Sequence, residues 1–228
     1  MIEAPITIEP MQAKYNRQVG RLLVQGFREK FHRLAKKMND EELSHFFETM
    51  LEAFPDESAG HRVIALQQGI VLGTLSMKWR SAAATSAKPE KQQQPAPTGR
   101  SFRQFGQFGL WTVFKLGVGL YLLDHQPQPG ECYIADLAVH PDYRSKGIGR
   151  QLLRRAQHVV ESEPGLTRLS LYVSENNPRA QALYEQFSFR VRSREYHPLW
   201  HFLFNEARWC YMVNDCGHGK SERREDYR

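Results

Sequence analysis

The feature that most constrains the fold is a glycine turn between a run typical of a buried strand and a run typical of a helix. Residues 132–139 are almost entirely apolar, and Gly147 and Gly149 follow a few positions later. Apolar residues then recur at helical spacing as far as Val160. Glycine lets the backbone approach a ligand closely, and the free N–H groups and dipole of a helix N-terminus favour an anion. The sequence therefore predicts a phosphate-binding turn here.

Two common phosphate-binding motifs do not fit this turn. No G-K-[ST] follows it, which excludes a nucleotide-binding P-loop, and the G-x-G-x-x-G of a Rossmann fold is absent. The chain carries a formal charge of +6, and basic residues surround the turn: Arg144, Lys146, Arg150, Arg154 and Arg155. This compact cluster suits a polyphosphate ligand better than a long duplex. Because no helix-turn-helix or zinc-finger pattern is present, we expect no nucleic-acid partner.

A second motif lies downstream of the turn and makes a family resemblance specific. Residues 134–149 read IADLAVHPDYRSKGIG, and residues 177–185 read NPRAQALYE. The first run resembles the acetyl-CoA motif of the GNAT family of N-acetyltransferases, R/Q-x-x-G-x-G/A after a strand. The second is similar to that family's N-x-x-A-x-x-L-Y-E. Phe189 matches the phenylalanine expected next, although Ser188 replaces the usual glycine, and the close resemblance ends there.

The resemblance implies an α/β fold in which a mixed, mostly antiparallel sheet is flanked by helices. One domain is expected to span residues 1–228. Local patterns agree with this fold upstream of the motifs. Asn39 and Glu42 predict a capping box at the start of a helix, and residues 62–66 and 70–77 predict a β-hairpin.

The resemblance also implies how acetyl-CoA binds. Three residues of the strand, where it splays from its neighbour, would pair with the pantetheine arm through their main chain: Leu137, Ala138 and Val139. The backbone amides that would hold the pyrophosphate belong to Arg144, Ser145, Lys146, Gly147, Ile148 and Gly149. Arg144 and Arg150 would screen phosphate charge, and Asn177 would contact the pantetheine region while capping its helix.

For catalysis, the resemblance implies direct attack of a neutral amine on the thioester. Tyr184 would protonate the departing thiolate, and a backbone N–H of the strand would stabilise the oxyanion. Some family members carry a glutamate base on this strand, but Tyr133 and Ala135 occupy the two positions where we would expect it. Asp136 is the candidate base, although strand alternation points it to the opposite face unless a bulge re-aims it. The alternatives are Glu131, His140, a water chain and a residue of the inserted segment.

Three segments depart from a compact domain pattern. Residues 81–100 are rich in alanine, proline, lysine and glutamine, which predicts a flexible linker. Residues 101–125 form a hydrophobic insertion, in which Lys115 and four glycines argue against a membrane span. We expect one or two helices that pack on the domain and line the acceptor pocket or a homodimer face, with contact to a membrane surface through 102–123 as the alternative. Residues 217–228 predict a loose polar tail.

Cysteine usage and the first residues of the chain favour a reducing cytoplasm. The three cysteines are odd in number and include no C-x-x-C pair, and no signal-peptide pattern opens the sequence. No spacing of histidines and cysteines indicates a metal site. The resemblance implies an acetyl-CoA-dependent N-acetyltransferase for a small-molecule or peptide amine. A catalytically weak or inactive acyl-CoA-binding sensor or scaffold is the alternative, because no obvious base is present.

Overall fold

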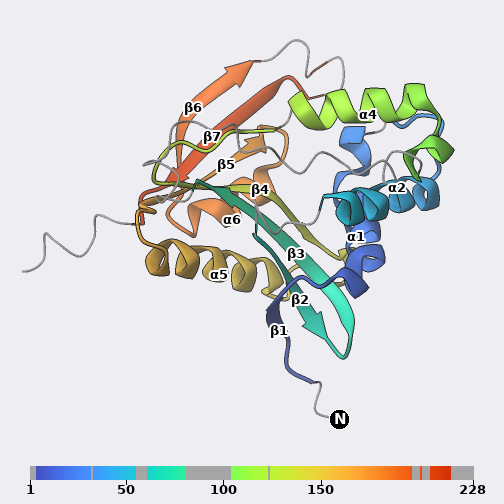
Figure 1. The fold of residues 1–228 in the computed structure, drawn as a ribbon. Helices are drawn as coiled ribbons and strands as arrows, with labels where there is room; N and C mark the ends of the chain where they lie inside the picture. Colours follow the sequence, from blue (N-terminus) through green and yellow to red (C-terminus); the bar gives the residue numbers. More distant parts are fainter. Residues whose placement is uncertain are drawn as a thin grey trace, which may run out of the picture.

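The computed structural model describes residues 4–31, 33–54, 61–80, 104–122, 124–196, 201 and 206–216. The predicted linker at 81–100 and tail at 217–228 lie outside these residues and stay predictions. The described chain forms one seven-stranded sheet with helices on both of its faces (Figure 1). This confirms the predicted α/β class.

The sheet is mixed and mostly antiparallel, as predicted. Its strand order is β1-β2-β3-β4-β5-β7-β6, and only β4 and β5 run parallel to each other. The strands are β1 (Thr7–Pro10), β2 (His61–Gln67), β3 (Ile70–Trp79), β4 (Glu131–Val139), β5 (Arg168–Ser174), β6 (Arg190–Tyr196) and β7 (Arg208–Asn214).

The described helices include five α-helices: α1 (Asn16–Phe31), α2 (Asp40–Ala53), α4 (Leu110–Leu122), α5 (Ile148–Ser162) and α6 (Pro178–Glu185). The capping box predicted at the start of α2 is confirmed. The Asn39 side chain accepts a hydrogen bond from the Glu42 N–H at 2.9 Å, and the Glu42 carboxylate accepts one from the Asn39 N–H at 2.9 Å. Two otherwise unpaired N–H groups of the helix end are satisfied in this way.

Two apolar clusters cover the two faces of the sheet. Alternate residues of β2 belong to different clusters, because successive side chains of a strand point to opposite faces. Val63 packs in the cluster that contains the apolar stripe of α5, and Ile64 packs in the cluster formed by α1 and α2. The sheet is therefore sandwiched between α5 with α6 on one side and α1, α2 and α4 on the other (Figure 1).

The hydrophobic segment after residue 103 forms a short 3-10 helix, Gly106–Phe108, and then α4. Leu116 of α4 and Phe105 are buried in the α1 and α2 cluster, which confirms helices packed on the domain. Among the described residues, no helix has the length and apolar character needed to cross a membrane. Whether the segment is an insertion, and whether it forms a dimer face, stays a prediction.

Strand β4 separates from β5 halfway along its length. The two strands pair only as far as Ile134, opposite Leu171, whereas β4 continues to pair with β3 as far as Val139. Residues 135–139 therefore have no strand partner on the β5 side within the described chain. A gap therefore opens between two parallel strands at this place.

A β-bulge in β4 lies at the start of this gap. Asp136 is opposite Ser76 and Ile134 is opposite Met77, so Ala135 is the extra residue on its strand. A bulge changes which face the following side chains point to. It therefore decides which residues of β4 can reach the gap from each side.

The effect of the bulge is visible in the packing on either side of β4. Ile134 and Leu137, three residues apart, both pack in the α5 cluster, whereas an uninterrupted strand would place them on opposite faces. Ala138 packs in the α1 and α2 cluster, and Asp136, two residues before it, shares that face. The bulge therefore turns Asp136 to the α1 side of the sheet, the possibility that the sequence left open.

Candidate active site

One cavity of about 1320 Å³ passes through the gap between β4 and β5. It is lined by the turn before α5, by residues 133–139 of β4 and by the end of β5. Beyond β4 it is lined by side chains of α1, α2 and α4. A single cavity therefore joins the predicted phosphate turn, the separated strands and the N-terminal helices.

The turn at one end of this cavity has a backbone conformation that favours glycine. Gly147 is the N-cap residue of α5 and has φ 81°, in the left-handed region that side chains other than glycine disfavour. The first intrahelical bond of α5 runs from the Gln151 N–H to the Gly147 carbonyl at 3.1 Å. The N–H groups of residues 148–150 therefore have no carbonyl partner among the described residues, which fits an anion at this helix end.

Gly149 lies in the first turn of α5, where there is little room for a side chain. A Cβ atom at this position would stand 3.3 Å from Leu183 Cδ2 and 3.9 Å from Val139 Cγ2. These contacts bring α5, α6 and the end of β4 together at the turn. Gly149 thus allows close packing here, whereas a Cβ at Gly147 would meet nothing within 4 Å.

The basic side chains at the turn differ in where they reach. Arg144 lines the cavity and donates from Nε to the Val139 carbonyl at 3.2 Å. Arg150 also lines the cavity and donates to the Gln186 side chain. Lys146 lies over the Tyr143 ring at 4.7 Å and does not line the cavity. Lys146 can therefore contribute to phosphate binding only through its main chain or its charge.

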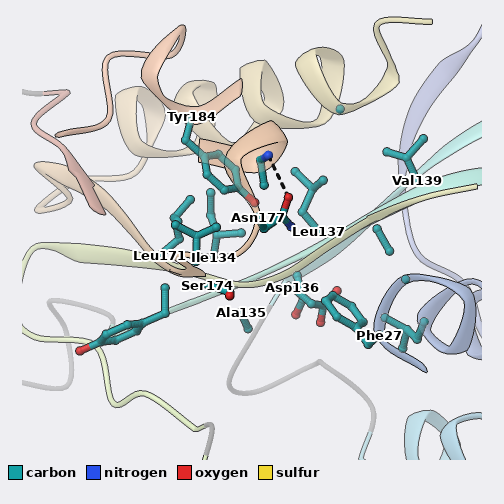
Figure 2. Close-up of a pocket in the computed structure, with 18 of the residues that line it drawn as sticks. Phe27, Ile134, Ala135, Asp136, Leu137, Val139, Leu171, Ser174, Asn177 and Tyr184 are labelled. Carbon is teal, nitrogen blue, oxygen red and sulfur yellow. Dashed lines mark hydrogen bonds between the residues drawn. The ribbon is translucent and has the colours of Figure 1, made fainter. Parts of the chain in front are cut away.

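Arg179 is a cavity residue that motif reasoning did not single out. Its guanidinium donates to the Ser145 hydroxyl at 2.9 Å and so ties α6 to the phosphate turn. Its neighbour Asn177 caps α6, accepting from the Ala180 N–H at 3.1 Å (Figure 2). Asn177 lines the same cavity, so the cap and the predicted contact with the pantetheine region are compatible.

Tyr184 reaches the cavity from α6. Its ring is buried and packs against Phe189 at 5.7 Å between centroids. The hydroxyl points from α6 toward β4 (Figure 2) and makes no hydrogen bond to any described residue. Burial, and to a lesser degree the charge of Asp136, raises the pKa of Tyr184 to about 12. The phenol therefore keeps its proton at neutral pH and can donate it.

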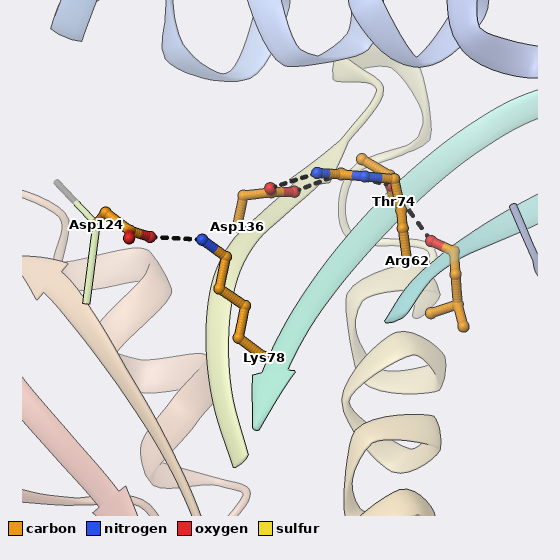
Figure 3. A network of polar contacts seen from close by, with 6 residues as sticks. Arg62, Thr74, Lys78, Asp124 and Asp136 are labelled. Carbon is orange, nitrogen blue, oxygen red and sulfur yellow. Dashed lines mark hydrogen bonds and ion pairs between the residues drawn. The ribbon is translucent and has the colours of Figure 1, made fainter. Parts of the chain in front are cut away.

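Asp136 enters the cavity from the other side of β4, held by a residue of β2. Arg62 donates to both carboxylate oxygens of Asp136 at 2.8 Å (Figure 3). A second ion pair follows along the same face, between Lys78 of β3 and Asp124. Arg62 was missed by sequence reasoning, because only the register of β2, β3 and β4 brings it opposite Asp136.

Glu131, a weaker candidate for the base, belongs to a buried network at the start of β4. Its side chain is 0% exposed and accepts from the Gln128 N–H at 2.7 Å, from Tyr211 at 2.6 Å and from Ser170. His125 Nε2 lies 3.0 Å away. Burial alone would raise the pKa of Glu131, but these hydrogen bonds outweigh it and lower the pKa to about 2. A carboxylate so weakly basic is suited to structure rather than to proton uptake.

The three cysteines differ in burial. Cys132 and Cys210 are buried and Cys216 is half-buried, and none forms a disulfide. Burial raises the pKa of Cys132 to about 12, which keeps it a neutral thiol. Among the described residues, no group of three or more histidine, cysteine, aspartate or glutamate side chains could hold a metal ion.

A mixed sheet whose two central parallel strands separate beside a glycine turn and a helix N-terminus defines a fold of acyl-CoA N-acyltransferases. The comparison with known families agrees: the sequence model of the acetyltransferase (GNAT) family matches residues 28–189. The chain therefore belongs to the GNAT family of acetyltransferases.

Individual relatives share shorter stretches of sequence. A mycothiol acetyltransferase of Beutenbergia cavernae is 38% identical over 85 residues, which cover 35% of this chain and 28% of that protein. A thialysine N-epsilon-acetyltransferase of Bos taurus is 34% identical over 71 residues, which cover 31% of this chain and 41% of that protein. The matches thus span less than half of either relative.

Solved structures agree with the fold over nearly the whole chain. A variant of the spermidine N-acetyltransferase SpeG from Vibrio cholerae has a TM-score of 0.57 at 14% identity, covering 92% of this chain and 94% of that one. A GNAT acetyltransferase from Streptococcus pneumoniae has a TM-score of 0.51 at 13% identity, covering 93% and 100%. At such low identity the likeness concerns the fold alone.

Proposed function

We propose that the chain transfers an acetyl group from acetyl-CoA to a primary amine by direct attack. The observation that carries the proposal is the continuous cavity between the helix N-terminus of α5 and the face of β4 that bears Asp136. A donor bound at the turn and an acceptor bound beyond β4 would meet in the gap between β4 and β5. The family membership and the two curated acetyltransferases support the same reaction class.

The chain's own residues fit the parts of coenzyme A. The N–H groups of residues 148–150 and the side chains of Arg144, Arg150 and Arg179 would bind the diphosphate. The main chain of Leu137, Ala138 and Val139 would pair with the pantetheine arm, because that edge of β4 has no strand partner in the described chain. When bound, coenzyme A supplies the activated acyl group.

Tyr184 would act as the general acid. A thiolate leaving from the donor needs a proton, and the Tyr184 phenol is the protonated group that points from α6 toward β4. Its raised pKa keeps the proton available until negative charge develops on sulfur. A backbone N–H of β4 beside the gap would stabilise the oxyanion.

Asp136 would orient the acceptor amine and receive its proton. An ionised carboxylate accepts at about four lone-pair sites, and Arg62 uses two of them. The remaining sites can accept from the N–H groups of an amine on the α1 side of β4. Asp136 would then pass the proton on to water.

The ion pair between Arg62 and Asp136 favours one other function, an acyl-CoA sensor or scaffold. Among the described cavity residues both carboxylates are already engaged in ion pairs, so neither is free of a cationic partner. This second candidate predicts tight binding of acetyl-CoA without turnover over a broad panel of amines. The enzyme predicts binding and turnover together.

The test has a binding arm and a catalytic arm. Calorimetry on the full chain should detect acetyl-CoA and coenzyme A, and failure to bind either would remove the proposal. With an active amine, Tyr184→Phe should lower kcat by about 100-fold or more and leave the Kd for acetyl-CoA nearly unchanged. Tyr196→Phe, an exposed tyrosine of β6 outside the cavity, is the matched control. Unchanged turnover in Tyr184→Phe would remove Tyr184 from the mechanism.

A further inference from the structure

The part of the cavity on the α1 side of β4 is walled by apolar side chains from three helices. They are Phe27 and Phe31 of α1, Met50 and Leu51 of α2, and Leu120 and Tyr121 of α4. The reacting amine would sit at the gap, and the rest of the acceptor would extend among these side chains. The chemistry of this wall therefore selects what the amine is attached to.

The charges in this part of the cavity cancel in pairs. Arg62 holds Asp136 through two hydrogen bonds, and Lys78 pairs with Asp124 (Figure 3). These two aspartates are the acidic side chains among the described residues that line the cavity. A second ammonium group on the acceptor would give up its water here without gaining a carboxylate of its own. An apolar group would replace water along the wall at no such cost.

We propose that the acceptor is a primary amine carried on an apolar body, with no second positive charge. This inference rests on the proposed acetyl transfer and names the acceptor class of that same site. It separates this chain from enzymes whose acceptors are polyamines, although the fold is shared with a spermidine N-acetyltransferase. The distinction comes from the paired aspartates and from the aromatic and aliphatic wall, and it is independent of the coenzyme turn.

A series of linear alkylamines tests the inference directly. From propylamine to hexylamine, kcat/KM should rise roughly fourfold for each added methylene, the fold-change that corresponds to about 0.8 kcal/mol per buried CH₂. Hexane-1,6-diamine has nearly the length of heptylamine but ends in an ammonium group instead of a methyl group. Its kcat/KM should be at least about tenfold below that of hexylamine. Acetylated products are quantified by mass spectrometry.

Two variants of α4 provide a matched pair for the same assay. Tyr121 lines the cavity and Phe114 does not, and both are exposed, at 79% and 59%, so neither truncation opens the core. Tyr121→Ala should raise the KM for hexylamine about tenfold and leave the KM for acetyl-CoA unchanged. Phe114→Ala should change neither constant.

The outcomes separate this inference from the proposal on which it rests. Preference for hexylamine over the diamine, together with the Tyr121 effect, supports it. Acetyl-CoA that binds and is turned over fastest with spermidine or hexane-1,6-diamine overturns the inference and leaves the acetyltransferase intact. Absence of acetyl-CoA binding overturns the proposed function instead.

Discussion

The buried carboxylate of Glu131 makes a sharp prediction about stability, and Glu131→Gln is the perturbation that tests it. Glu131 lies where β4 and β5 still pair, just before they separate. Its carboxylate accepts from Ser170 of β5 and Tyr211 of β7. Glutamine has the same shape but carries no charge; its amide oxygen can keep the bonds to Oε1, whereas its NH₂ group cannot accept the bond that the Gln128 N–H donates to Oε2. The substitution therefore removes the charge while it preserves the packing of three strands.

The size of the effect follows from the pKa of Glu131, which falls from 4.5 to about 2 in the folded chain. At 1.36 kcal/mol per pKa unit, the ionised carboxylate stabilises the fold by about 3 kcal/mol at pH 7. Because the folded pKa is the lower one, this stability is complete above pH 4.5 and is lost as the pH falls toward 2. At pH 3 about 1 kcal/mol remains.

Urea unfolding of wild type and Glu131→Gln at pH 7 and pH 3 measures this contribution. The difference between their unfolding free energies should be about 3 kcal/mol at pH 7 and should shrink by about 2 kcal/mol at pH 3. Glu163→Gln, at the exposed C-cap position that follows α5, controls for the chemical change and should have an unfolding free energy within about 0.5 kcal/mol of wild type at pH 7. If the difference in unfolding free energy between wild type and Glu131→Gln did not change with pH, the reasoning would be refuted.

Two further substitutions test the frame of the cavity. Gly73→Ala places a Cβ 2.9 Å from Ile148 Cγ2 and 3.2 Å from the Ala138 carbonyl. We expect calorimetry or urea unfolding to show that the unfolding free energy falls by about 1–3 kcal/mol. Gly106→Ala is the control, because a Cβ at Gly106 meets nothing within 4 Å. Arg62→Met removes the ion-pair partner of Asp136 and should lower the unfolding free energy by about 2 kcal/mol. Adding Asp136→Leu should recover part of that loss. Strict additivity of the last two changes would contradict the ion pair.

Much of the fold could be predicted because it depends on local chemistry. Asn39 and Glu42 specify a helix start within four residues, and the capping box follows from their side chains alone. The turn at Gly147 is equally local, because a positive φ there favours glycine. The same holds for Asn177, whose side chain caps α6 from the position next to Pro178.

What could not be predicted depends on register between distant strands. Nothing in the run from Tyr133 to Leu137 signals a bulge, since its residues are compatible with regular alternation. The bulge exists because β3 and β4 pair out of step between Ser76 and Met77. The Arg62 pair with Asp136 depends on the same register, 74 residues apart in sequence. The candidate site residues could therefore be named from sequence motifs, whereas the partner that holds Asp136 could not.

The bulge also determines how closely α1 can approach β4. Because Ala135 is extra, Ala138 rather than Leu137 faces α1, and only a small side chain there lets the helix approach. Gly26 of α1 meets it so closely that a Cβ on Gly26 would stand 3.1 Å from the Ala138 Cβ. Without the bulge, Leu137 would occupy this contact and push α1 away from β4. The extra residue therefore sets both the direction of Asp136 and the width of the cavity in which its amine partner would bind.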